Sequence, residues 1–148
     1  MKYKGVIIPE MPASAANYLP YVIHGDLLFV SGQLPISEGK LIYKGKLGES
    51  FDLEQGVEAA RLVGLNILAV VKEACNGDLD RVKRCIKIGG FVNSLPDFTK
   101  QPLVINGCSD LMIEVFGEDR GKHARFAVSS QSLPFNASVE IESLFSIC

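Results

Sequence analysis

The most regular pattern in the sequence is a helical repeat of apolar residues from about Leu53 to Cys75. Its apolar residues recur every three or four positions, as on the buried face of an amphipathic helix. Asp52 and Gln55 have the spacing of a capping box at its start, and Asn76-Gly77 supplies a stop at its end. A helix with one apolar face has to pack against a second layer of structure.

Apolar runs of strand length lie on both sides of this helix. They are rich in β-branched and aromatic residues and are bounded by turn residues, which is typical of strands. A second helix is expected from about Pro102 to Phe116, with Gly117 as its stop. The predicted strands are a hairpin over Tyr21 to Gln33 with its turn at His24-Gly25-Asp26, a short strand at Leu41 to Tyr43, and strands over Arg81 to Val92, Arg125 to Ser130 and Ser138 to Ile147.

This order of elements predicts an α+β fold in which one sheet carries both helices on the same face. The chain has 148 residues, of which 47% are hydrophobic, so it can bury one sizeable core, and residues 1–148 are expected to form a single domain. The stretch from Pro9 to Pro20 contains three prolines and is expected to be extended or looping chain.

Composition and charge argue against several classes of partner. The net charge of −2 comes from 15 basic and 17 acidic residues scattered along the chain, so nucleic acid is not expected to bind. The four cysteines form no CxxC pair and the two histidines lie far apart, which gives a metal site little support. No apolar run is long enough to span a membrane, and the first residues lack the apolar core of a signal peptide, so reduced thiols and a cytoplasmic location are expected.

Arg125 is the residue most indicative of chemistry, because it begins the apolar run Ala124-Arg125-Phe126-Ala127-Val128. A guanidinium that enters a sheet needs a carboxylate, since an unpaired buried charge is costly. Glu140, Glu142 or a ligand could supply it. From spacing alone, a structural ion pair between Arg125 and Glu140 is the favoured interpretation, and the two glutamates on one strand face are weak evidence for acid–base catalysis.

Other polar or small residues could line a binding site. Gly32, next to Ser31 at a strand end, leaves backbone amides open to a ligand oxygen, although such a glycine is usually a bulge or turn. Asn106, a poor helix former inside the second helix, could bond a ligand or face solvent. Tyr18 could stack on a ligand or simply pack in the core. Ser31 has no histidine at an informative spacing, so no hydrolase triad is predicted.

Together these segments resemble the RidA/YjgF family, from about Ala15 to Phe145. The C-terminal block is its most specific part, and the block around Gly32 agrees with it. The matching segments are Asn17-Tyr18, Leu28-Phe29-Val30-Ser31-Gly32-Gln33-Leu34-Pro35, Ala124-Arg125-Phe126-Ala127-Val128, Leu133-Pro134 and Val139-Glu140-Ile141-Glu142.

The resemblance implies a chorismate-mutase-like fold with a mixed six-stranded sheet, assembled as a homotrimer with clefts between subunits. In the deaminase members, the arginine that matches Arg125 grips the carboxylate of a 2-imino or 2-enamino acid. The glutamate that matches Glu140 positions the hydrolytic water, and no metal or organic cofactor is required. The resemblance also implies that Tyr18, Ser31, Gly32, Asn106 and Ala127 line the pocket; Ala127 stands where a cysteine is common.

The resemblance therefore implies a hydrolytic deaminase that releases ammonia and a 2-keto acid. A protein of the same fold that only binds a keto acid or amino acid is the alternative. A ribonuclease or translation inhibitor comes third, because the chain has no basic stripe with interleaved aromatic residues. The opening Ala16-Asn17-Tyr18-Leu19-Pro20-Tyr21 departs from the usual family sequence, and the loop around Lys100 to Leu103 is longer. These departures indicate a divergent branch of longer members and argue against the usual small substrates, while the retained arginine keeps deamination possible.

Overall fold

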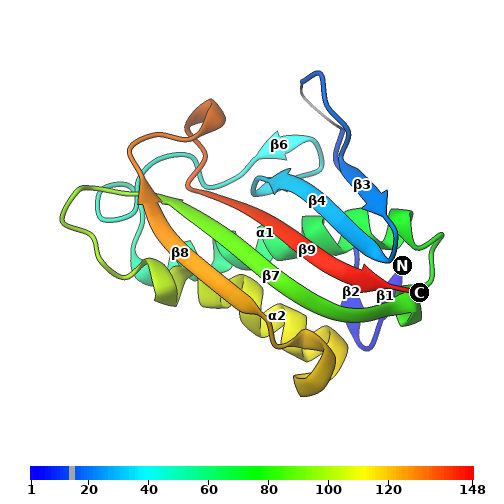
Figure 1. Ribbon diagram of the computed structural model, residues 1–148. Coiled ribbons are helices and arrows are strands. Elements are labelled where there is room, and N and C mark those ends of the chain that lie inside the picture. Colours follow the sequence, from blue (N-terminus) through cyan, green and yellow to red (C-terminus); the bar gives the residue numbers. More distant parts are fainter. Residues whose placement is uncertain (14–15) are drawn as a thin grey trace.

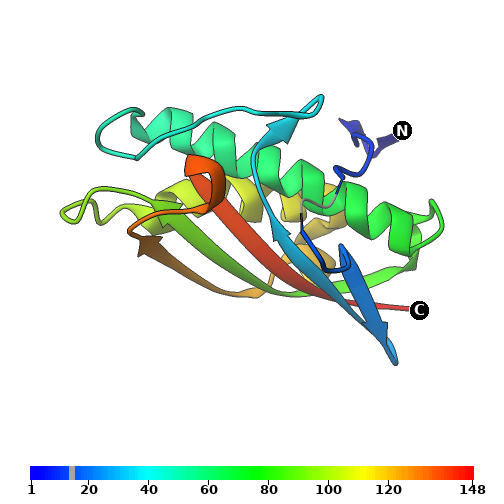
Figure 2. The ribbon, with the colours of Figure 1, turned by 90° about the horizontal axis from the view of Figure 1, so that it is seen from above.

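A computed structural model describes residues 1–13 and 16–148 of the chain. Ser14 and Ala15, which fall in the stretch predicted to be extended and include the start of the family resemblance, lie outside the described residues. The described chain forms a twisted sheet with two long helices on one face, as predicted (Figures 1 and 2). The helices are α1 (Leu53–Ala74) and α2 (Gln101–Gly121).

The main sheet has five strands in the order β3-β4-β9-β7-β8. Only β7 and β8 run parallel; the other neighbours are antiparallel, so the sheet is mixed. Its strands are β3 (Tyr21–His24), β4 (Leu27–Gln33), β7 (Val82–Asn93), β8 (Ala124–Ser130) and β9 (Val139–Ile147).

The expected sixth strand does not join this sheet. After β4 the chain turns at Leu34 and Pro35, and β5 (Ile36–Ser37) pairs with β6 (Lys40–Leu41) in a separate two-stranded hairpin. A second small hairpin, β1 (Lys2–Tyr3) with β2 (Val6–Ile7), begins the chain. The short strand near residue 41 exists, but it pairs locally because the turn at residues 34–35 directs the chain away from β4.

The predicted ends of α1 and the predicted break at Gly117 are confirmed, but α2 continues beyond that break to Gly121. Asp52 and Gln55 form a reciprocal capping box, in which each side chain accepts a hydrogen bond from the other residue's backbone N–H. In α2 the helical dihedrals break at Gly117, which has φ 83°. A further turn then runs to Gly121, and two short 3-10 turns lie at Leu79–Arg81 and Pro134–Asn136.

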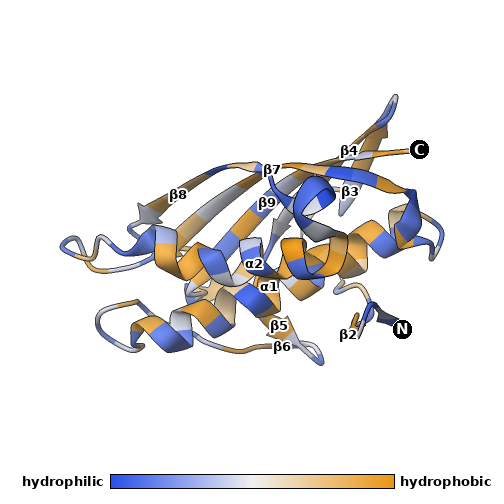
Figure 3. Cartoon of the chain, turned by 90° about the horizontal axis from the view of Figure 1, so that it is seen from below, coloured by the Kyte–Doolittle hydropathy of each residue, from blue (hydrophilic) through white to orange (hydrophobic). Residues whose placement is uncertain are grey.

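The core lies between the sheet and the helices. In β9, Val139, Ile141 and Phe145 are fully buried beneath the helices. Gly90 of β7 lets α2 approach closely, since a Cβ there would lie 2.6 Å from Ile105 Cδ1. Apolar and polar residues mix along both helices, as the hydropathy colouring shows (Figure 3). No helix among the described residues is long and apolar enough to cross a membrane.

The other face of the sheet is not covered by a helix of the described residues and carries large apolar side chains. Phe29 of β4 and Val128 of β8 are each 45% exposed, and Val22 of β3 is 48% exposed. Phe91 and Phe126 pack edge to face beside them, with ring centroids 5.3 Å apart. We call this surface the open face.

Candidate functional site

Glu140 lies against the end of β4, where the strand pairing is irregular. The register between β4 and β9 shifts between Val30 and Gln33, and Gly32 falls in this bulge. A Cβ at Gly32 would overlap the Glu140 Oε2 atom and lie 3.1 Å from Cδ. Only glycine at position 32 leaves enough space for the Glu140 carboxylate at the end of β4.

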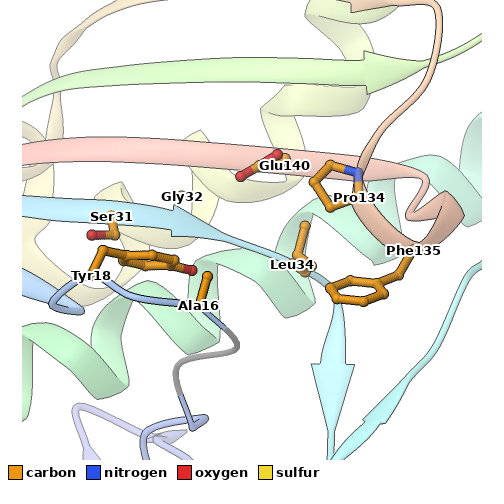
Figure 4. A pocket seen from close by; sticks show the side chains of 8 residues that line it. All are labelled: Ala16, Tyr18, Ser31, Gly32, Leu34, Pro134, Phe135 and Glu140. Atoms are coloured by element: carbon orange, nitrogen blue, oxygen red, sulfur yellow. The ribbon is translucent and has the colours of Figure 1, made fainter.

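A cavity of about 580 Å³ opens beside this carboxylate (Figure 4). Tyr18 and Ala16 lie at one end of the cavity, and Pro134 and Phe135 lie at the other. The full lining is Ala16, Tyr18, Ser31, Gly32, Leu34, Pro134, Phe135 and Glu140.

Ser31 and Glu140 are the two cavity side chains whose surroundings bear on their properties. The Ser31 hydroxyl donates a hydrogen bond of 2.6 Å to the Leu19 carbonyl, so it anchors the segment that carries Tyr18. Burial raises the pKa of Glu140, and repulsion from Glu142 on the same strand face raises it further. Glu140 therefore binds a proton more tightly than an exposed glutamate does, which makes it a stronger base.

Arg125 belongs to a second polar cluster, between α2 and the edge strand β8. Its Nη1 group donates to Asn106 Oδ1 at 2.8 Å and to Ser109 Oγ at 3.2 Å, and its Nη2 group donates to the Pro102 carbonyl at 3.2 Å. The three acceptors come from the N-terminal half of α2. They orient the guanidinium without neutralising its charge.

His123 extends this cluster and determines the direction of its hydrogen bonds. Its Nδ1 atom lies 2.7 Å from the Gly121 carbonyl, which can only accept, so Nδ1 carries the proton. In the neutral ring Nε2 then accepts from the Ser109 hydroxyl at 2.8 Å. Burial lowers the pKa of His123, and the charges of Arg125 and Arg84 lower it further. Because the Ser109 hydroxyl donates its proton to neutral His123, its oxygen lone pairs are available to accept the hydrogen bond from Arg125.

The favoured ion pair between Arg125 and Glu140 is absent, and the register explains why. Arg125 pairs with Ile88 of β7, which is fully buried beneath the helices, so Arg125 points to the helix side. Glu140 alternates with the buried Val139 and Ile141, so it points to the open face, and Glu142 shares that face as predicted. Among residues 1–13 and 16–148, no carboxylate forms an ion pair with Arg125.

The sequence matches the family model described as "YjgF/chorismate_mutase-like, putative endoribonuclease" over residues 2–146. The chain belongs to this family. TCP17 of Trypanosoma cruzi is 47% identical over 140 residues, which cover 95% of this chain and 87% of that protein. These matches confirm the resemblance that the sequence segments indicated.

Solved structures agree with this assignment. The Agrobacterium tumefaciens protein Atu1372, described as of unknown function, is 50% identical with a TM-score of 0.91, and the match covers 97% of this chain and 87% of that one. Escherichia coli TdcF, solved with bound serine, shares the fold at 22% identity with a TM-score of 0.67, over 97% of this chain and 99% of TdcF.

Within this YjgF-family chain the predicted site residues fall into two separate groups. Tyr18, Ser31, Gly32 and Glu140 line the cavity, whereas Asn106 and Arg125 belong to the second cluster. Ala127 lines neither; it lies two residues after Arg125 on β8 and packs against the core.

The residues of these groups that sequence reasoning missed include Ser109, His123 and Phe135. Ser109 could have been found, because it follows Asn106 by three positions and so shares its helix face. No group of three or more histidine, cysteine or acidic side chains that could hold a metal occurs in the described ranges. The described cysteines are free thiols, with Cys75, Cys85 and Cys108 buried and Cys148 exposed.

Proposed function

We propose that this protein hydrolyses reactive 2-imino and 2-enamino acids to ammonia and 2-keto acids, in the cytoplasm and without a cofactor. The observation that carries the proposal is that the Glu140 cavity and the Arg125 cluster are separate within one chain. We call each of them a half-site. One holds a carboxylate of raised pKa beside a cavity, and the other holds an oriented arginine that has no carboxylate partner in the described part of the chain.

The two half-sites would meet between neighbouring subunits of a homotrimer. The open face has large exposed apolar side chains that need a cover, and a second copy of the chain supplies a complementary one. In such an assembly, Arg125 at the outer edge of the sheet faces the cavity of the next subunit. Each cleft then contains Arg125 from one protomer and Glu140 from its neighbour.

The chemistry follows from these two groups. Three of the five N–H donors of Arg125 are used by α2, and the others are directed to the planar carboxylate of the substrate. Ionised Glu140 accepts a proton from water as the water oxygen adds to the C=N carbon. The proton passes to nitrogen and gives a carbinolamine. Glu140 then takes the proton of the new hydroxyl group and delivers it to nitrogen as the C–N bond breaks, so ammonia leaves and the C=O group of the 2-keto acid forms.

The proposal is tested by generating imines in place with an L-amino-acid oxidase and following keto-acid release. The chain should accelerate release, and Arg125→Ala should reduce the acceleration by about 100-fold, the value of a lost charged hydrogen-bond pair. Arg61→Ala is the matched control, because Arg61 forms a surface ion pair of 2.9 Å with Glu114 away from both half-sites. Equal acceleration by Arg125→Ala and the parent would overturn the proposal.

A non-catalytic binding protein is the second candidate, favoured by the serine that TdcF of the same fold holds. Saturable binding of a 2-keto acid or amino acid, lost in Arg125→Ala but with no turnover of any imine, would establish it. The third candidate, ribonuclease activity, has less support from a chain of net charge −2. RNA cleavage that persists in Arg125→Ala and co-purifies with the protein would favour it.

A further inference from the structure

Phe135, in the loop between β8 and β9, places its aromatic ring at the rim of the cavity. Its backbone adopts an unfavourable conformation there. Phe135 has φ 58°, in the left-handed region that glycine and asparagine adopt most easily, yet its side chain is 68% exposed. A ring so exposed contributes little to the folding of the protomer. Glycine would satisfy the backbone better, so the fold alone does not explain the phenylalanine.

The loop that carries Phe135 is held firmly. Asn93, which is fully buried, donates from Nδ2 to the Ala137 carbonyl at 3.0 Å and to Asn136 Oδ1 at 3.3 Å. Lys46 donates from Nζ to Asn93 Oδ1 at 2.8 Å and also bonds the Gln131 carbonyl. The ring is thus presented by a loop with fixed ends, which lowers the entropy lost when a ligand contacts it.

The cavity wall beside the ring is apolar. Leu34 and Pro134 adjoin Phe135, and Tyr18 lies at the far end (Figure 4). The polar groups are gathered at the strand end, where Glu140 and Gly32 meet. A ligand whose reacting carbon lies at Glu140 therefore has polar contacts on one side and an apolar wall of several side chains on the other.

We propose that Phe135 is a specificity-determining residue that selects substrates with a large apolar or aromatic side chain over those with a methyl or hydroxymethyl group. This inference rests on the proposed function and names the substrate class of the same site. The side chain of such a substrate packs between Phe135, Pro134 and Leu34 while its imine carbon reaches Glu140. A volume of about 580 Å³ accommodates a side chain of this size.

The test compares imines derived from phenylalanine, leucine and alanine, with the parent and two variants at one position. Phe135→Gly suits the backbone and removes the ring, whereas Phe135→Tyr keeps the ring. The ratio of kcat/KM for the phenylalanine imine to that for the alanine imine should exceed one in the parent. It should fall about tenfold in Phe135→Gly and stay near the parent value in Phe135→Tyr.

Dissociation constants for phenylpyruvate and pyruvate give a second readout that does not depend on turnover. Phe135→Gly should weaken phenylpyruvate binding selectively. Failure of the parent to hydrolyse any imine would refute the proposed function alone, because this binding preference still tests the inference. A Phe135→Gly variant that affects both ligands equally, or that changes the oligomeric state, would overturn the inference and place the ring in a subunit contact.

Discussion

The Glu140 carboxylate occupies the space that a side chain on Gly32 would need. A Cβ at Gly32 would overlap Oε2 and lie 3.1 Å from Cδ and 3.3 Å from Cγ, so the whole end of the glutamate side chain is seated on the glycine. The bulge in β4 that brings Gly32 to this place is part of the site, because it fixes how far the carboxylate reaches into the cavity.

Gly32→Ala is expected to displace Glu140 and to lower kcat/KM by about 100-fold, the cost of misplacing a catalytic group by about 1 Å. The overlap should also lower the free energy of unfolding by about 1–3 kcal/mol. In a Glu140→Ala background the same substitution should cost much less, because the clashing atoms are gone. Chemical denaturation of the four proteins measures this coupling, and equal costs in both backgrounds would show that the contact is not the cause.

The pH profile of activity should report on the pair Glu140 and Glu142. Glu140 has to be ionised to accept a proton from water, so kcat/KM should fall as the pH falls through its raised pKa. Glu142→Gln removes the repulsion that contributes to this raised pKa, and the acid limb should move to lower pH. Glu140→Gln should abolish the limb and reduce activity by about 100-fold or more. An acid limb that stays in place in Glu142→Gln would contradict this assignment.

Ser109 should affect ligand binding through Arg125 without touching the ligand. Ser109→Ala removes one of the three acceptors that orient the guanidinium. The dissociation constant for a 2-keto acid should rise by about three- to tenfold, the equivalent of one hydrogen bond. Ser37→Ala, on the exposed hairpin β5–β6, is the matched control. Unchanged affinity in Ser109→Ala would mean that Asn106 and Pro102 suffice to orient Arg125.

His123 should make the folded state less stable in acid. Its folded-state pKa is lowered, so the unfolded chain binds the proton more readily. Stability is therefore lost as the pH falls through about 6.5, the unfolded value, and levels off below the folded pKa. His123→Gln should flatten the dependence of the unfolding free energy on pH between about 5 and 7. His24→Gln, at the other and exposed histidine, is the control.

The sequence predicted the regular elements because their signals are local. The capping box at Asp52 and the stops at Asn76 and Gly117 are each read within a few residues. The structure begins α1 after Asp52, ends it before Asn76 and breaks the helical dihedrals of α2 at Gly117. The number of strands in the main sheet could not be predicted from local signals in the same way. Pairing of the short strand near Leu41 depends on where the turn after β4 sends the chain, which local propensity does not specify.

The sequence indicated residue types for a candidate site, but it did not predict how they are arranged. Arg125 and Glu140 were identified, yet the ion pair expected between them was wrong, because the face that a residue occupies depends on the register between strands. Ser109 was not predicted as a site residue, because the polar residues of α2 were interpreted only as interruptions of its apolar face. Phe135 gave no signal, since nothing in the sequence around it indicates a left-handed backbone for a phenylalanine.

We propose that each site combines Arg125 of one subunit with Glu140 of the next, because the two residues lie on opposite faces of one sheet. The most direct measurement is the activity of mixed oligomers of Arg125→Ala and Glu140→Gln, each of which alone is expected to be about 100-fold or more less active than the parent. In random trimers, a site is intact when the arginine comes from the Glu140→Gln subunit and the glutamate from its Arg125→Ala neighbour, so about a quarter of the parent rate should return. Mixed oligomers that are no more active than either variant alone would contradict the claim.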